Sequence, residues 1–238
     1  MLSNIIKEGR VDYKPIWFMR QAGRHLKDYR KLRLKHTNFI QFCLDEDSII
    51  EATLIPMKKY NLDAAIIFSD ILIIPWLLGQ KIEFIKNFGP KLIPLAECEE
   101  ILENSFDLNK LVSIRNAISK VKLELCNNKE LIGFAGAPWT LACYMIEGHG
   151  SRTFEKTRRL MWKDRKLFIK LINKLTICIV DWLEFQAKAG ADILMIFDTW
   201  SHMIPSEVWK EFAIDPIKQI ITDLKNRKIY SPIIGFPF

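Results

Sequence analysis

The sequence has little of what marks secreted or disulfide-stabilised proteins. Five cysteines occur among 238 residues, an odd number, and no two of them form a C-x-x-C pair. A disulfide framework is therefore not expected, and a reducing, cytoplasmic location fits best. The N-terminal residues also lack the long apolar stretch and the small-residue cleavage site of a secretory signal.

No stretch of the chain is apolar enough over a sufficient length to cross a membrane. The most apolar segment, residues 64–78, is shorter than a spanning helix and contains both Asp70 and Pro75. A carboxylate would be costly inside lipid. We therefore expect no membrane span and interpret this segment as a buried strand followed by a new element.

Dedicated metal and nucleic-acid signatures are also missing. The four histidines form no H-x-x-x-H or H-x-C pattern, so no metal site is expected. There is no zinc finger, no aromatic RNA-binding signature and no dense block of Lys and Arg, which argues against nucleic acid as a partner. Lys plus Arg nevertheless total 35 against 28 for Asp plus Glu, a net charge of +7. This surplus favours an anionic partner, although charge alone does not separate an anionic membrane from a polyanionic small molecule.

Short apolar runs recur along the chain at long intervals. They are apolar on both faces, which is typical of strands in a parallel sheet covered by helices. Gly, Pro, Ser or Asp bounds each of them. The predicted strands are Pro15–Met19, Ala64–Phe68, Leu131–Phe134, Asp192–Phe197 and Pro232–Phe236.

Helical patterns separate these runs. Leucine and isoleucine recur at helical spacing over residues 154–188, and Gly190 is a natural C-cap for that helix. Residues 45–54 and 111–125 predict two more helices. Alternating strands and helices indicate an α/β architecture, and we expect residues 1–238 to form one domain. Five strands are too few to close an eight-stranded barrel, so the pattern fits a small open sheet or an incomplete barrel.

Polar clusters follow the first two predicted strands. Arg20 and Arg24 flank a loop with Gly23 and could present paired guanidinium groups to carboxylates or phosphates, or could simply be two surface arginines. Asp70 interrupts the apolar run after the second strand. A buried carboxylate needs donors or a cation, although Asp70 could also cap the next element.

Two further clusters follow later strands. Gly136 would let the backbone approach a ligand closely, and the alternative is a tight turn with Trp139 and Tyr144 in the core. Asp198 and Thr199 are candidate polar site groups or a helix cap. All four clusters lie at carboxyl ends of predicted strands, where parallel barrels place their active sites. This shared position strengthens the functional interpretation of each.

Two of these segments resemble signature segments of the uroporphyrinogen decarboxylase family. One is Pro15–Arg24, with the sequence PIWFMRQAGR, and the other is Gly133–Leu141, GFAGAPWTL, followed by Tyr144. Residues 68–72 and 197–200 match the family in type and order. The resemblance extends over the chain from Pro15 to Pro237.

The resemblance implies a (β/α)₈ TIM-type barrel that uses no cofactor or metal and usually forms a homodimer. The family is a carboxy-lyase family of porphyrin and heme biosynthesis. It removes carbon dioxide from the four acetate side chains of uroporphyrinogen III and so produces coproporphyrinogen III.

Matching motifs assign roles to individual residues. Arg20 and Arg24 would hold substrate carboxylates, and Gln21, Ala22 and Gly23 would complete that substrate-binding loop. Three further residues complete the set, which are Asp70, Tyr144 and Thr199. The Asp70 carboxylate would face the pyrrole N–H groups and stabilise the positive charge of the transition state. Tyr144 and Thr199 would contact the substrate, with Thr keeping the hydroxyl of the Ser that is common in the family.

The sequence departs from the family pattern at its C-terminal end. The family has a histidine in a Gly-rich segment near its C-terminus, and neither His149 nor His202 matches that motif. We therefore expect the chain to correspond to the N-terminal two-thirds of the barrel, about five of the eight strand–helix units, with the C-terminal part missing. Alternatives are a non-catalytic remnant, a tetrapyrrole-binding fragment, and the zinc-dependent methyltransferases that share this fold but use His and Cys ligands.

Overall fold

The computed structural model describes residues 2–9, 14–85, 88–125 and 128–237. Its α-helices are α1 (Leu2–Glu8), α2 (Lys27–Leu34), α3 (Phe39–Leu44), α4 (Glu46–Lys59), α5 (Ile73–Leu77), α6 (Val112–Glu124), α7 (Pro138–Glu147), α8 (Glu155–Lys163), α9 (Arg165–Ala189) and α10 (Asp215–Asn226). Its strands are β1 (Ala64–Ile66), β2 (Ile82–Ile85), β3 (Gly89–Leu92), β4 (Glu130–Gly136), β5 (Ile193–Asp198) and β6 (Ile233–Pro237). Short 3₁₀ turns and one π-helical turn, Lys210–Ile214, connect them.

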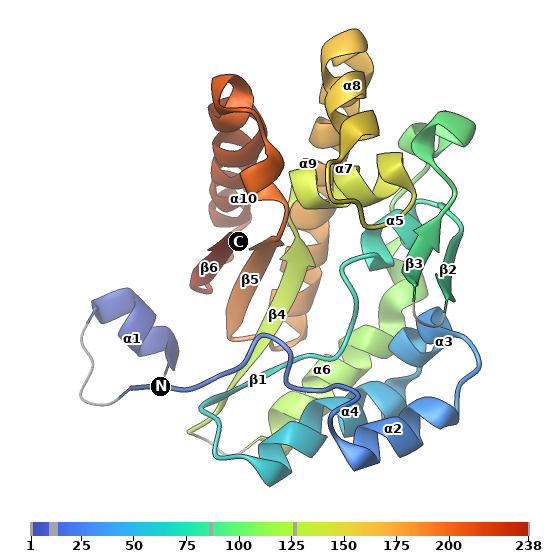
Figure 1. The fold of residues 1–238 in the computed structure, drawn as a ribbon. Helices are drawn as coiled ribbons and strands as arrows, with labels where there is room; N and C mark the ends of the chain where they lie inside the picture. Colours follow the sequence, from blue (N-terminus) through green and yellow to red (C-terminus); the bar gives the residue numbers. More distant parts are fainter. Residues whose placement is uncertain (1, 10–13, 86–87, 126–127, 238) are drawn as a thin grey trace.

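The central feature is a parallel sheet with the strand order β1-β4-β5-β6. Helices α6 and α9 lie behind it in Figure 1, α4 lies below β1 and α10 packs beside α9, whereas α5, α7 and α8 lie beyond the carboxyl ends of its strands. The α/β class and four of the five predicted strands are thereby confirmed. The described residues form an open four-stranded parallel sheet and no closed barrel.

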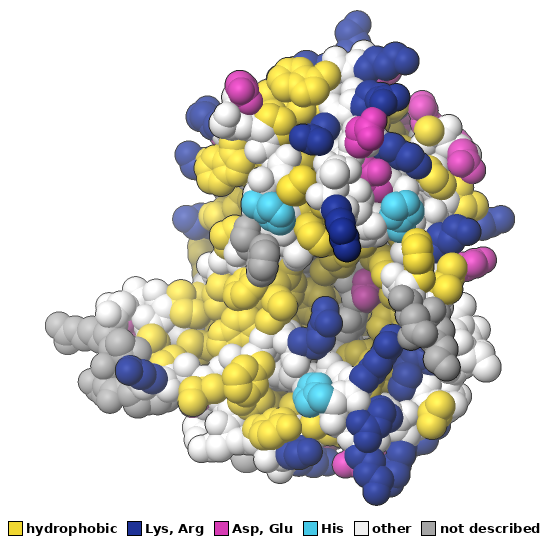
Figure 2. Space-filling view, viewed as in Figure 1, with side chains coloured by type: hydrophobic (Ala, Val, Ile, Leu, Met, Phe, Trp, Pro, Cys, Tyr) yellow, Lys and Arg dark blue, Asp and Glu magenta, His cyan; other side chains and the backbone are white. Residues whose placement is uncertain are grey.

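Side chains alternate between the two faces of this sheet, as strand geometry requires. On β5, Leu194 and Ile196 join the large core under the helices, while Met195 and Phe197 point to the opposite face. We call that opposite side the inner face. It comprises Leu2, Ala64, Ile66, Ile132, Ile193, Met195 and Phe197, with Trp17, Ile71, Phe134, Ile234 and Phe236 packed against them. Figure 2 shows hydrophobic side chains exposed there, on the side that a closed barrel encloses.

The predicted strand Pro15–Met19 is wrong. The segment does lie beside the start of β1, where the Asp63 N–H donates to the Ile16 carbonyl at 2.9 Å. In the other direction, the Ile16 backbone N–H donates to the side-chain carboxylate of Asp63 at 2.6 Å, and not to a backbone carbonyl. Farther along, the same edge of β1 is paired by the side chain of Gln21. Because side-chain groups occupy this edge, no backbone ladder forms.

The predicted helix over 154–188 is two helices. Asp164, with φ −130° and ψ 74°, separates α8 from α9, and its carboxylate caps α9 by accepting from the Leu167 N–H at 3.0 Å. Gly190 ends α9 with φ +120°, which confirms the predicted C-cap position. The helices predicted at 45–54 and 111–125 are confirmed as α4 and α6. The antiparallel hairpin β2–β3 was not predicted.

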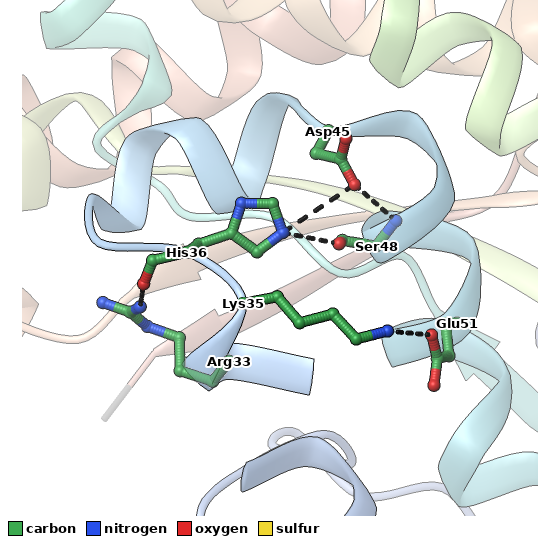
Figure 3. Close-up of polar contacts among 6 residues, drawn as sticks. All are labelled: Arg33, Lys35, His36, Asp45, Ser48 and Glu51. Carbon is green, nitrogen blue, oxygen red and sulfur yellow. Dashed lines mark hydrogen bonds and ion pairs between the residues drawn. The ribbon is translucent and has the colours of Figure 1, made fainter. Parts of the chain in front are cut away.

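A polar cluster ties the end of α2 to the start of α4 (Figure 3). The His36 Nε2 lies 2.8 Å from the Ser48 hydroxyl and 3.8 Å from the Asp45 carboxylate. The same carboxylate accepts from the Ser48 N–H at 2.9 Å and so caps α4. Because hydroxyl and carboxylate face one imidazole nitrogen, this is not a hydroxyl–imidazole–carboxylate relay. The cluster therefore joins α2 to α4, the helix that packs against β1.

Candidate functional site

The predicted site residues gather where β1, β4 and β5 end. Arg20 lies in the loop beside β1, Asp70 follows β1, and Tyr144 lies on α7 after β4. Burial raises the pKa of both Asp70 and Tyr144, and the Arg20 guanidinium lies close enough to oppose that rise at each of them. Three segments that are distant in the sequence therefore bring a cation, a carboxylate and a phenol into one electrostatic unit.

Asp70 is the centre of this unit. Its Oδ1 accepts a hydrogen bond from the Leu72 N–H at 2.9 Å, so it turns the chain toward α5. Its other oxygen accepts no hydrogen bond from the part of the chain that the structure describes. Desolvation raises the pKa of Asp70 to about 6, and the Leu72 N–H and Arg20 oppose that rise. The carboxylate is thus mainly ionised at neutral pH, with an oxygen left for a ligand.

The loop that carries the two arginines is anchored from inside. Gln21 is 3% exposed and its carboxamide bonds to β1, while Arg20 and Arg24 on either side of it are exposed. The Leu26 N–H donates to the Gly23 carbonyl at 3.0 Å, and Arg30 donates to the Arg24 carbonyl at 2.7 Å. A fixed loop backbone thus presents two guanidinium groups to the solvent above β1.

Tyr144 faces an indole at the end of β5. Its ring centroid lies 6.3 Å from that of Trp200. Burial raises the pKa of Tyr144, and the Asp70 charge raises it further, whereas Trp200 and Arg20 act to lower it. The Trp200 indole N–H is buried and has no hydrogen-bond partner among the described residues. Because the pKa of Tyr144 is raised above that of a free phenol, its hydroxyl is protonated at neutral pH and can donate to a ligand.

Thr199 lies between two residues that α7 holds in place. The Thr140 hydroxyl donates to the Asp198 carboxylate at 2.8 Å and accepts from the backbone N–H of Trp200 at 3.2 Å. Trp139 adds a bond from its indole to the Trp200 carbonyl at 3.0 Å. Thr199 itself is partly buried and makes no hydrogen bond within the described residues. The structure brings Thr199 to the same end of the sheet but shows no contact that joins it to Asp70.

Sequence reasoning missed Thr140 and Tyr29. Thr140 lay within a recognised motif, but nothing in the spacing indicated that it bonds Asp198. Tyr29 packs its ring 5.7 Å from that of Phe68, beside the end of β1. Burial raises the pKa of Tyr29 to about 12, and the charges of Arg24 and Asp70 both reach it. Only the path of α2 beneath the loop brings Tyr29 there.

Gly136 fits the tight turn that was one of its two expected roles. A Cβ at this position would lie 2.8 Å from the Leu141 side chain and 3.2 Å from Ile71. The glycine therefore allows close packing of the chain on itself.

The surface hollows of the described structure lie apart from these residues. Two surface hollows lie on outer helices, between α9 and α10 and beside α8, and neither touches the residues above. Among the described residues no three His, Cys, Asp or Glu side chains are grouped as metal ligands. No helix in the described ranges is both long and apolar enough to cross a membrane.

Comparison with known proteins gives consistent results. The sequence model of the family described as "Uroporphyrinogen decarboxylase (URO-D)" matches residues 1–238. The uroporphyrinogen decarboxylase of Rickettsia felis is 45% identical over 224 residues, which are 94% of this chain and 65% of that protein. That of Rickettsia africae is 44% identical over 231 residues, 97% of this chain and 67% of that protein. The chain thus spans about two thirds of the length of these relatives.

A solved structure supports the fold alone. The methyltransferase from Methanosarcina mazei superposes with a TM-score of 0.74 at 14% sequence identity. The match covers 100% of this chain and 68% of that chain. At this identity the similarity carries no statement about reaction or ligand.

Proposed function

The chain belongs to the uroporphyrinogen decarboxylase family, and on that premise we propose that it converts uroporphyrinogen III to coproporphyrinogen III. The reaction removes carbon dioxide from four acetate side chains. The observation that carries the proposal is the convergence of Arg20, Asp70 and Tyr144 at the carboxyl ends of the sheet strands. This is the end at which parallel barrels build active sites.

The reaction needs an electron sink, and the substrate itself supplies one. Protonation of a pyrrole carbon makes the ring a cation, and the C–CO₂ bond then breaks with its electron pair moving into that ring. A second proton converts the exocyclic methylene to a methyl group, and the ring loses the first proton. No cofactor is required by this balance of atoms and electrons.

Asp70 would act on the charge that develops in this sequence. A carboxylate facing the pyrrole N–H groups accepts their hydrogen bonds and stabilises the ring cation. Its free oxygen and its partly desolvated position support the role, because low local polarity strengthens such an interaction. The carboxylate must be ionised to do so, which a pKa of about 6 allows at neutral pH.

The remaining residues would bind and orient the substrate. Arg20 and Arg24 would pair with its carboxylates, while Gln21, Ala22 and Gly23 complete the loop between them. Tyr144 and Thr199 would contact the macrocycle through their hydroxyl groups. The exposure of both guanidinium groups and the protonated state of Tyr144 support these roles.

We also propose a setting for the chain. It would act as one domain in the cytoplasm, as a homodimer, on a small tetrapyrrole and not on nucleic acid. The large core cluster draws on residues from Leu26 to Leu224, which supports one domain. The four described cysteines are free, which supports a reducing compartment.

The test is direct. Purified chain is incubated anaerobically with uroporphyrinogen III, and coproporphyrinogen and carbon dioxide are measured for the wild type and for Asp70→Asn. We expect Asp70→Asn to lower turnover about 10²–10³-fold, the usual cost of losing one preorganised electrostatic group. Equal turnover in the two proteins would contradict the role of Asp70.

A parallel binding titration separates the alternatives. Uroporphyrin, the fluorescent oxidised form of the substrate, serves as the probe. Binding without release of carbon dioxide would identify a tetrapyrrole-binding fragment instead of an enzyme. Neither binding nor turnover would identify a non-catalytic remnant and overturn the proposal.

A further inference from the structure

Gln21 lies between the two arginines of the loop, yet its side chain points away from the solvent. It is 3% exposed. Its Nε2 donates to the Ala64 carbonyl at 2.7 Å, and its Oε1 accepts from the Ile66 N–H at 3.1 Å. One N–H and the carbonyl oxygen of the carboxamide are therefore bonded to the backbone of β1, and the burial of the side chain keeps the rest of the group from the solvent.

The two bonds follow the pattern of a parallel β-ladder. In such a ladder, one residue donates its N–H to the carbonyl before a facing residue and accepts through its own C=O from the N–H after that residue. The Gln21 carboxamide does the same around Ala65, since Ala64 and Ile66 are the residues before and after it. One side-chain amide thus takes the place of the N–H and C=O of a residue on a neighbouring strand at this point of β1.

This contact fixes the position of the arginine loop along β1. A ladder bond has a defined register, so Gln21 can dock at Ala65 only with its own Cα at one position along β1. Arg20 and Arg24 are tied to that position by a few covalent bonds. Asp70 follows the same strand four residues after Ile66, so the register of Gln21 also sets the distance from the arginines to Asp70.

We propose that Gln21 is a positioning residue, which sets the two guanidinium groups relative to Asp70 because its carboxamide pairs with β1 as the backbone of a strand residue facing Ala65 would. The inference rests on the proposed function for the roles of Arg20 and Arg24. It replaces a direct substrate contact of Gln21 by an indirect action through the loop backbone.

The chain contains a matched control. Gln186 on α9 is 0% exposed, and its carboxamide pairs with the backbone of β4. The Phe134 N–H donates to Gln186 Oε1 at 2.9 Å, and Gln186 Nε2 donates to the Phe134 carbonyl at 2.9 Å. Both glutamines bond through their carboxamide to the backbone of a sheet strand, and both are buried. Only Gln21 belongs to the arginine loop.

The experiment compares Gln21→Met with Gln186→Met in the whole chain. Methionine keeps the length of the side chain but leaves a strand N–H without its partner at either position, which costs about 1–3 kcal/mol of stability. The Phe134 carbonyl keeps its bond from the Trp182 indole at 3.0 Å. Uroporphyrin affinity is then measured well below the melting temperature and at several salt concentrations. We expect Gln21→Met to raise Kd on the order of tenfold and to reduce its salt dependence, since mispositioned groups lose their contacts. Gln186→Met should bind as the wild type does.

A second comparison tests whether Gln21 acts on uroporphyrin affinity through the two arginines. In the Arg20→Ala/Arg24→Ala background, Gln21→Met should change Kd no further, because there is no guanidinium group left to position. Gln21→Glu keeps the size and the acceptor but loses the N–H donor, and should raise Kd in the same way. Wild-type affinity in Gln21→Met, or an equal loss in Gln186→Met, would overturn the inference. Failure of both Gln21 variants to fold, while Gln186→Met folds, would also overturn it by making Gln21 a purely structural group.

The outcomes separate this inference from the proposed function. If the Arg20→Ala/Arg24→Ala protein binds uroporphyrin as the wild type does, the substrate role of the loop is wrong. If that protein loses affinity while Gln21→Met keeps it, only the positioning role of Gln21 is wrong.

Discussion

The hydroxyl of Thr140 on α7 donates a 2.8 Å hydrogen bond to the carboxylate of Asp198 at the end of β5. The same hydroxyl oxygen accepts from the backbone N–H of Trp200. One threonine therefore couples the helix that carries Tyr144 to the segment that carries Thr199. Asp198 is 8% exposed, and this bond compensates only part of the cost of its burial.

Asp198→Asn should stabilise the protein at neutral pH. Burial raises the pKa of Asp198 from 3.8 to about 6, so the folded state binds more protons than the unfolded state between these values. Stability therefore declines as pH rises through this window, and the penalty is complete above about pH 6. Its size is on the order of 3 kcal/mol. Asparagine keeps the acceptor for Thr140 and removes the charge.

Urea unfolding at pH 7.5 and near pH 3.5 measures this effect. We expect Asp198→Asn to exceed the wild type at pH 7.5 and to match it at the lower pH. Asp28→Asn, at a carboxylate whose side chain is 69% exposed, serves as the control and should change little. Lower stability of Asp198→Asn than of the wild type at pH 7.5 would contradict a raised pKa of Asp198, because the folded protein would then favour the ionised carboxylate.

Arg20→Ala and Arg24→Ala should each weaken binding of uroporphyrin by about tenfold, because each removes a charge-assisted contact with a carboxylate. Lysine at the same positions should lose less, since it keeps the charge but not the planar fork. Fluorescence titration at several salt concentrations is the measurement. Arg159→Ala, which breaks only an exposed pair with Glu155 on α8, should bind normally.

Trp139 and Trp200 should respond differently to the same substitution. Trp139→Phe removes a 3.0 Å bond to the Trp200 carbonyl and should cost about 1–3 kcal/mol. Trp200→Phe removes an indole N–H that has no well-formed bond, so it should be close to neutral apart from small packing changes. Thermal or urea unfolding of the two variants gives the comparison. A larger loss for Trp200→Phe than for Trp139→Phe would contradict the assignment of bonds.

Residues 1–238 alone should self-associate. The inner face leaves Ile234 and Phe236 only partly covered, and β6 has no strand on its outer side within the described residues. An unpaired apolar edge of this kind recruits other chains. Light scattering should therefore show oligomers that increase with concentration. Ile234→Lys should reduce them, and Trp162→Lys, on the exposed surface of α8, should not. A monodisperse wild-type monomer would refute this prediction.

Local sequence signals determined much of the fold. Apolar runs bounded by turn residues placed β1, β4, β5 and β6, since strands buried on both faces have this composition wherever they lie. Asp45 and Gly190 marked helix ends because capping depends on neighbouring residues alone. The position of polar residues just after strands indicated one shared site, because parallel strands all end at the same edge of a sheet.

The tertiary structure decided what depends on partners distant in the sequence. Pro15–Met19 has the composition of a strand, but a strand also needs a backbone partner, and Asp63 and Gln21 occupy the available edge of β1. Gln21 matched a substrate-binding motif, yet its carboxamide is buried, which no spacing along the chain could indicate. The proximity of Arg20 to Asp70 likewise arises only from packing. Sequence specifies which groups are available, and long-range contacts select which of them remain free for a ligand.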